Sequence, residues 1–191
     1  MFYKLISKLL DYPDAELIAA IPELREEINH GSGRSFEAAE WLVLDRFLNH
    51  LSGLDATEAQ AAYVQTFDLT PEHALHLTHH LFGDDKNRGP ALIDLTEFYK
   101  DYGLELAVSR EGEGGANEHA ANEAAVNELP DYLPLVLEFA SQLDPDEARV
   151  FLSQWSKVLG QLATNLEEAG SPYAPLVRLV EQRSLLVRAA A

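Results

Sequence analysis

A group of histidines offers the first candidate for chemistry in this chain: His73, His76, His79 and His80. Spacings of three and four residues place three of them, at 73, 76 and 80, on one face of a helix predicted over 70–83. Imidazoles at this spacing can bind a metal ion. No cysteine or acid completes the set within the helix, although Asp84 continues the face. We favour half-buried imidazoles that line the core or a groove, and keep a metal site as an alternative.

Acidic and basic side chains follow at two predicted helix starts. Asp84 and Arg88 lie in a tight turn between two helices, where capping and a local ion pair are the simplest interpretation. Glu128 and Asp131 lie with Tyr132 at the head of a helix predicted over 130–142, where the helix dipole favours acids. Each group alone indicates capping.

Patterns typical of catalysis are absent from the sequence. No serine lies in a nucleophile elbow, and neither a phosphate loop nor a G-x-G-x-x-G pattern is present. The chain has no cysteine, which excludes a thiol nucleophile, disulfides and iron–sulfur ligation by this chain. We therefore expect no enzyme activity, and neither a bound cofactor nor a catalytic metal.

Charge narrows the possible partners. With 14 basic and 32 acidic residues, the net charge is −18. Such a surface repels nucleic acid and anionic membranes and favours a basic partner. Because no apolar run approaches the roughly 20 residues that span a bilayer, we expect no membrane insertion and a cytoplasmic protein.

Proline and glycine divide the chain into helices, and strand signals are nearly absent. The sequence therefore predicts an all-α fold, with a single domain over 1–188 built from about nine helices. The predicted helices span 2–10, 14–28 with an interruption near Pro22, 35–51 with Ser35 as its cap, 57–67, 70–83, 90–103, 130–142, 145–169 and 172–185.

A low-complexity stretch separates two sets of predicted helices. Residues 109–127 are acidic and contain no aromatic side chain, so they cannot bury enough apolar surface to offset the entropy of ordering. We predict a mobile linker over 104–127, with an N-terminal set of helices over 1–103 and a C-terminal set over 128–188.

Taken together, four segments resemble the nitrate reductase branch of the NarJ/TorD/DmsD family of assembly chaperones. They are Y-V-Q-T-F-D-L-T-P at 63–71, L-H-L-T-H-H at 75–80, G-D-D-K-N-R-G-P-A-L at 83–92 and N-E-L-P-D-Y-L-P-L-V-L-E-F at 127–139. The resemblance implies a helical chaperone that binds the N-terminal segment of the nitrate reductase catalytic (alpha) subunit. It would keep the apoenzyme competent for molybdenum cofactor and iron–sulfur insertion before membrane docking. Proteins that deliver the molybdenum cofactor are further candidate partners.

In the wider family, an E-P-x-D-H segment helps to form the peptide site, and this chain has E-L-P-D-Y at 128–132, with tyrosine in place of histidine. The resemblance and the residue chemistry together predict a groove with an aromatic floor and an acidic rim, suited to a basic amphipathic helix. The predicted peptide-binding residues are Tyr63, Phe67, His76, His79, His80, Asp84, Arg88, Tyr99, Glu128, Pro130, Asp131 and Tyr132.

Two other classes of function stay open at this point. A helical protein could bind a metal or a small molecule through the histidines between His73 and His80. A structural subunit of a stable complex would instead co-purify with the mature enzyme.

Overall fold

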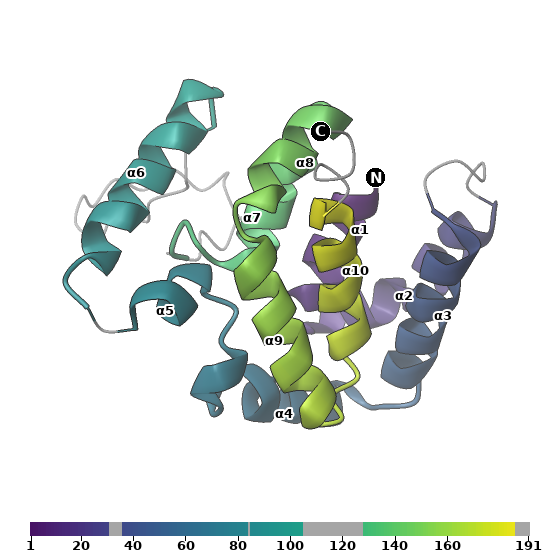
Figure 1. The fold of residues 1–191 in the computed structure, drawn as a ribbon. Helices are drawn as coiled ribbons and strands as arrows, with labels where there is room; N and C mark the ends of the chain where they lie inside the picture. The colour runs from purple at the N-terminus through teal and green to yellow at the C-terminus, as the bar shows by residue number, and fades with distance from the viewer. Residues whose placement is uncertain (31–35, 84, 105–127, 186–191) are drawn as a thin grey trace, which may run out of the picture.

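A computed structural model describes residues 1–30, 36–83, 85–104 and 128–185. Within these ranges the chain forms ten α-helices and no strand, which confirms the all-α prediction (Figure 1). The first six helices are α1 (Phe2–Leu10), α2 (Ala15–His30), α3 (Ala38–Ser52), α4 (Ala56–Tyr63), α5 (Leu77–Phe82) and α6 (Arg88–Asp101). The last four are α7 (Leu133–Ala140), α8 (Pro145–Ser153), α9 (Ser156–Glu168) and α10 (Ala174–Leu185). A π-helical turn, Val64–Asp68, and a 3-10 turn, Pro71–His73, lie between α4 and α5.

A central group of helices carries most of the core. α1 packs on α7 and α10 packs on α9, while the α2–α3 pair lies on one side of this group and the α5–α6 pair on the other (Figure 1). The largest fully buried side chains come from both halves of the sequence: Ile6, Leu9, Leu10, Leu44, Leu48, Leu51, Leu77, Tyr99, Leu133, Leu137, Leu152 and Leu159. Residues before and after the predicted linker therefore share one core.

The bounds of α1 agree with the prediction. Its apolar residues bury one face against α7, and the hydroxyl of Ser7 on that face donates a hydrogen bond of 2.7 Å to the backbone oxygen of Pro134. The helix ends where Asp11 takes an extended conformation (ψ 168°), two residues before Pro13. This ending brings Asp11 towards the residues described in the next section.

Proline at position 22 does not interrupt α2, so that part of the prediction is wrong. A proline inside a helix removes one backbone hydrogen bond and clashes with the preceding turn. Here Pro22 is exposed, while Ile21 before it and Ile28 after it are buried in the core. Tertiary packing on both sides of the proline keeps the helix continuous.

Two further predicted helix bounds differ from the structure. Glu37 caps α3 in a reciprocal capping box with Glu40, whereas the predicted cap, Ser35, lies outside the described residues. The long helix predicted over 145–169 is divided into α8 and α9, because the amides of Gln154 and Trp155 bond to carbonyls three residues back. The apolar side chains on both sides of the break are nevertheless buried: Ala148, Phe151, Leu152, Val158, Leu159, Leu162 and Leu166.

Aromatic side chains hold α6 against the central helices. Phe98 stacks on Phe151 of α8 with ring centroids 5.5 Å apart, and Tyr99 contacts Phe139 of α7 at 4.5 Å. Aromatic pairs of this kind stabilise the packing beyond what burial of the ring surfaces alone contributes. α6 is therefore fixed at its C-terminal half, and its N-terminal end lies beside α5.

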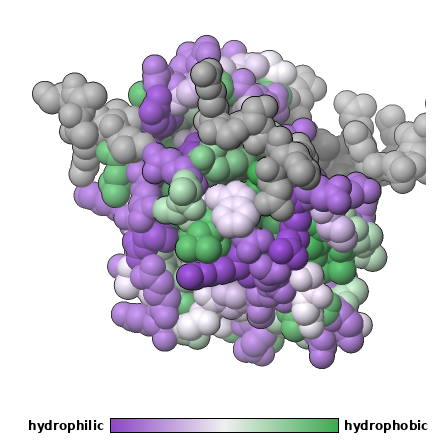
Figure 2. Space-filling view, turned by 90° about the vertical axis from the view of Figure 1, so that its right-hand side faces the viewer, coloured by the Kyte–Doolittle hydropathy of each residue, from purple (hydrophilic) through white to green (hydrophobic). Residues whose placement is uncertain are grey.

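One face of the molecule is largely polar. Figure 2 shows the side of the molecule that lies on the right of Figure 1, where a few apolar residues interrupt a largely hydrophilic surface. No helix in the described ranges combines the length and the apolar character that crossing a membrane requires.

Candidate functional site

The histidines do not lie on one continuous helix, so the predicted helix over 70–83 is wrong. After the 3-10 turn Pro71–His73 the backbone becomes extended, and α5 begins only at Leu77. The reason is a pairing across the sequence. The amide of Leu77 donates to the backbone oxygen of Asp131 (3.0 Å), and the amide of Leu133 donates to that of Leu75 (2.8 Å). His76 and Tyr132 thereby face each other in an isolated antiparallel bridge.

The 128–132 segment, which follows the third gap in the described chain, is the centre of the site. Three consecutive residues, Pro130, Asp131 and Tyr132, each bond to a different part of the fold. The backbone oxygen of Pro130 accepts a hydrogen bond of 2.8 Å from the buried hydroxyl of Tyr99. Burial raises the pKa of Tyr99, so this hydroxyl keeps its proton and remains a donor at neutral pH.

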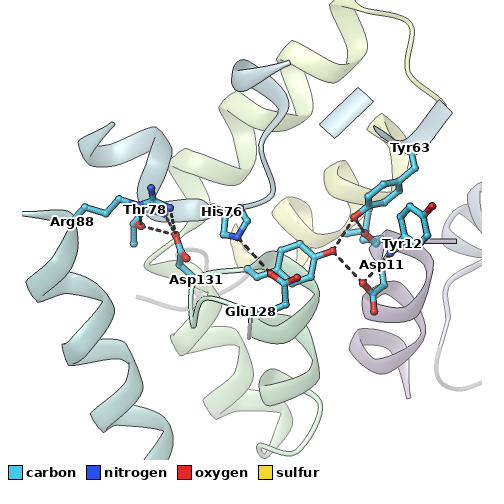
Figure 3. A network of polar contacts seen from close by, with 10 residues as sticks. Asp11, Tyr12, Tyr63, His76, Thr78, Arg88, Glu128 and Asp131 are labelled. Atoms are coloured by element: carbon cyan, nitrogen blue, oxygen red, sulfur yellow. Dashed lines mark hydrogen bonds and ion pairs between the residues drawn. The ribbon is translucent and has the colours of Figure 1, made fainter. Parts of the chain in front are cut away.

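Asp131 is completely buried, at 0% exposure. Its Oδ2 accepts hydrogen bonds from the amide (2.9 Å) and the hydroxyl (2.5 Å) of Thr78, and lies 3.9 Å from Nη2 of Arg88. Arg88 Nε in turn donates to the hydroxyl of Thr78 at 3.1 Å. A buried charge needs such partners. Asp131 therefore joins α5 and α6 to the 128–132 segment (Figure 3).

Tyr132 is the third of these consecutive residues and reaches the opposite side of the site. Its hydroxyl donates to Oδ1 of Asp11 at 3.1 Å and lies 2.8 Å from the hydroxyl of Tyr63. The hydroxyl of Tyr63 also donates to the backbone oxygen of Leu10 at the end of α1. Burial raises the pKa of both tyrosines, so both phenols are neutral hydrogen-bonding groups.

An imidazole and a carboxylate lie between these two groups of contacts. His76 Nε2 is 3.7 Å from Glu128 Oε2, with 32% and 38% of the two side chains exposed. The imidazole ring also contacts the ring of Tyr132, with centroids 5.4 Å apart. Figure 3 shows the result as a row of polar side chains that runs from Arg88 through His76 to Asp11.

The other histidines serve separate contacts. His73 is buried, and its Nδ1 lies 3.1 Å from the backbone oxygen of Thr66, while Nε2 of His80 lies 2.7 Å from that of Ala74. Burial lowers the pKa of His80. The rings of His79 and His80 are 6.0 Å apart. Among the residues that the structure describes, no group of three or more histidines and acids could hold a metal ion.

The predicted site residues fall into two sets by exposure. Tyr63, Phe67, Tyr99, Pro130 and Asp131 are buried. The remaining described residues are half-buried or exposed: His76, His79, His80, Arg88, Glu128 and Tyr132. Asp84 lies outside the described residues.

Sequence reasoning missed two members of the row. Thr78, which is 1% exposed, stands among the histidines and looked like a helix residue of no special role. Asp11 marks the end of α1, and its only local signal is the Asp11-Tyr12-Pro13 helix stop. Both act through residues that are distant in the sequence, which no local pattern reveals.

Several known proteins are similar to this chain over most of its length, although no family model matches the chain. The chain is 35% identical over 176 residues to the nitrate reductase molybdenum cofactor assembly chaperone NarJ of Escherichia coli K12, covering 92% of this chain and 66% of the relative. It is 32% identical to the nitrate reductase-like protein NarX of Mycobacterium tuberculosis, covering 91% of this chain and 23% of that protein. The probable chaperone NarJ of Bacillus subtilis is 28% identical, covering 93% and 85%.

The chain is an all-α protein, and its E. coli and B. subtilis relatives are named as assembly chaperones. The chain belongs to the NarJ family. It spans 66% of the length of the E. coli relative, slightly less than two thirds.

Proposed function

We propose that this protein is a chaperone for the assembly of a nitrate reductase. In this proposal it binds the N-terminal segment of the catalytic subunit and keeps the apoenzyme competent for molybdenum cofactor and iron–sulfur insertion before the enzyme docks at the membrane. The observation that carries the proposal is the similarity to the E. coli chaperone across 92% of this chain. The segments that carry the resemblance, 75–80 and 127–139 among them, include residues that form the row of polar contacts around residues 128–132.

Within the proposal, the exposed members of the row contact the peptide. His76, Glu128 and Tyr132 are half-buried or exposed and lie next to one another. Arg88 is 24% exposed at its side chain and borders the same row. These groups offer a carboxylate, an imidazole, a phenol ring and a guanidinium to an incoming segment.

The buried members support this surface. Tyr63, Phe67 and Tyr99 are each 5% exposed or less, so a bound peptide would reach them only after neighbouring segments had moved apart. We therefore assign them, with Asp131, to holding the 128–132 segment in place. The predicted aromatic floor of the groove then lies beneath the contact surface.

Charge supports a basic ligand. The chain carries a net charge of −18, which attracts a basic peptide and accelerates encounter most strongly at low salt. Affinity itself would come mainly from apolar side chains of the peptide that are buried on binding. Binding that weakens moderately with salt is the expected signature.

The test is calorimetric titration of the full chain with the N-terminal peptide of its nitrate reductase catalytic subunit, at two salt concentrations. Saturable binding that weakens with salt supports the proposal. Glu128→Gln should weaken binding, because it removes the exposed carboxylate beside His76. Asp94→Asn, at an exposed position on α6, is the matched control and should bind as the wild type does. A wild-type chain that shows no saturable binding at either salt concentration would overturn the proposal.

A second arm separates a chaperone from a structural subunit. A chaperone should co-purify with the catalytic subunit before cofactor loading and be absent from the mature enzyme. Stoichiometric recovery with the loaded enzyme would show that the protein is a subunit instead.

A further inference from the structure

Asp11 occupies a position that helix energetics disfavour. It is the residue directly after α1, and the C-terminal end of a helix carries partial negative charge, so an acid is least favourable there. Its neighbour Leu10 has a helix-terminal carbonyl that already receives the hydroxyl of Tyr63. Capping of α1 therefore does not require a carboxylate at position 11.

The contacts of Asp11 lead into the candidate site. Oδ1 accepts the hydroxyl of Tyr132 at 3.1 Å and the amide of Tyr12 at 2.9 Å. The amide bond fixes the carboxylate on its own backbone, as in a short Asx-type turn. The bond to Tyr132 then links the end of α1 to a residue 121 positions later in the sequence.

Tyr132 connects the Asp11 carboxylate to His76, which is in the exposed part of the row. Its backbone is paired with that of His76, and its ring contacts the imidazole. The imidazole lies 3.7 Å from the Glu128 carboxylate. The side chain of Asp11 bonds to the hydroxyl of Tyr132, whose ring contacts His76.

We propose that Asp11 is a positioning residue of the peptide site: by accepting the hydroxyl of Tyr132, it sets the orientation of the Tyr132 ring and of His76 that the peptide meets. This inference rests on the proposed function. It names a residue that makes no contact with the ligand, in a loop at the end of α1, as a determinant of affinity.

A purely structural role gives a different expectation. Asp11 is half-buried and Tyr12 beside it is exposed, so the hydrogen bond lies at the edge of the core. A bond at such a place contributes little to global stability but can still fix the orientation of a ring. Affinity should thus change more than stability when Asp11 is replaced.

The variants are chosen to separate these roles. Asp11→Ala removes the acceptor, whereas Asp11→Asn keeps an amide oxygen that can accept the same two hydrogen bonds. Tyr132→Phe removes the donor and keeps the ring. Asp14→Ala is the matched control, because Asp14 lies in the same loop and caps α2 by accepting the amide of Leu17. This control loses a helix cap and leaves Tyr132 untouched.

Calorimetric titration of these full-length variants with the N-terminal peptide of the catalytic subunit gives the first readout. We expect Asp11→Ala and Tyr132→Phe each to weaken binding about tenfold, which corresponds to about 1.4 kcal/mol, because a ring that is no longer fixed must be ordered when the peptide binds. The double variant should bind about as weakly as either single variant, because both remove one interaction. Asp11→Asn should retain most of the affinity, and Asp14→Ala all of it.

Amide hydrogen exchange of the free protein gives a second readout that requires no peptide. In Asp11→Ala, the amides of Leu77 and Leu133 that pair around the His76–Tyr132 bridge should exchange faster than in the wild type and in Asp14→Ala. If the wild type binds the peptide but Asp11→Ala binds equally well with unchanged exchange, the positioning role is wrong and the proposed function stands. If Asp14→Ala weakens binding as much as Asp11→Ala does, the effect is one of stability and the inference is overturned. If the wild type binds no peptide, the proposed function is overturned and the peptide-site role of Asp11 with it, and faster exchange in Asp11→Ala would then show only that Asp11 fixes Tyr132.

Discussion

Replacement of Asp131 tests the central claim that this carboxylate holds the site together from within. In Asp131→Ala, the buried amide of Thr78 loses its acceptor, which costs about 1–3 kcal/mol for one unsatisfied buried donor. The hydroxyl of Thr78, which is 1% exposed, loses its acceptor as well, whereas solvent partly compensates Arg88, whose side chain is 24% exposed. The total loss should therefore be about 2–4 kcal/mol of unfolding free energy.

Asp131→Asn should cost less, about 1–2 kcal/mol, because the amide oxygen can still accept both hydrogen bonds from Thr78. What it removes is the negative charge 3.9 Å from Arg88. The new amide group would take the place of Oδ1, which has no hydrogen-bond partner among the residues that the structure describes. The ordering of the two variants is thus fixed by the bonds that each one keeps.

Urea unfolding followed by circular dichroism is the assay, with the midpoint and the slope fitted separately. An unchanged slope would show that the variants unfold from a similarly compact state. Asp94→Ala, an exposed acid on α6, is the control and should stay within about 0.5 kcal/mol of the wild type. If Asp131→Ala lost less than about 1 kcal/mol, the carboxylate would not be the internal tie that we describe. A loss in the expected range means that binding studies should use Asp131→Asn, since the alanine variant removes a large part of a typical domain's stability.

Three further predictions concern single groups. Tyr63→Phe removes the hydroxyl that donates to the backbone oxygen of Leu10 and lies beside the hydroxyl of Tyr132. The variant should lose about 1–2 kcal/mol of unfolding free energy in the same urea assay. An unchanged unfolding free energy would show that the hydrogen bond to α1 does not stabilise the fold. Burial raises the pKa of Glu40, but hydrogen bonds from Arg183 and the amide of Glu37 together have the stronger effect, so the pKa lies below 4.5. The ionised carboxylate therefore stabilises the fold above pH 4.5, and this stabilisation is lost as the pH falls through the lowered pKa. Thermal melts between pH 3 and 6 should show a shallower pH dependence for Glu40→Gln, and identical curves would exclude this role. Burial lowers the pKa of His80 below 6.5, so the native state holds the neutral imidazole and loses stability as the pH falls from 6.5 towards the lowered pKa. An NMR titration of the folded protein that gave a pKa of 6.5 or higher for His80 would refute this prediction.

Local patterns predicted the helices of the core and their buried faces. The apolar run 2–10 ends at a clear stop, Asp11-Tyr12-Pro13, so the bounds of α1 could be read directly. Apolar residues at helical spacing from Ala148 to Leu166 indicate a buried face, and they are buried in the structure although the turn at Gln154 divides the predicted helix. Periodicity thus predicts what faces the core better than it predicts where a helix ends.

The candidate site was less accessible to sequence reasoning, for one physical reason. Thr70-Pro71 is a good helix start, and the histidine spacing continues it, but pairing of residues 75–77 with residues 131–133 is an alternative that no local signal shows. Similarly, Asp131 follows the pattern of an exposed helix-start acid, and only Thr78 and Arg88 make its burial possible. Where long-range partners decide the outcome, a local interpretation is incomplete.

The distance along the sequence between these partners has a consequence during protein synthesis. Ser7 and Pro134 are 127 positions apart and Asp11 and Tyr132 are 121 apart, so α1 leaves the ribosome long before its partners exist. Until residues 128–133 are translated, Thr78, Tyr99 and the backbone of Leu75 and Leu77 have no partners from that segment. A nascent or truncated copy would thus lack the surface proposed to hold the peptide. Only a copy translated beyond residue 133 would hold the peptide, and shorter ribosome-bound fragments would leave the peptide free.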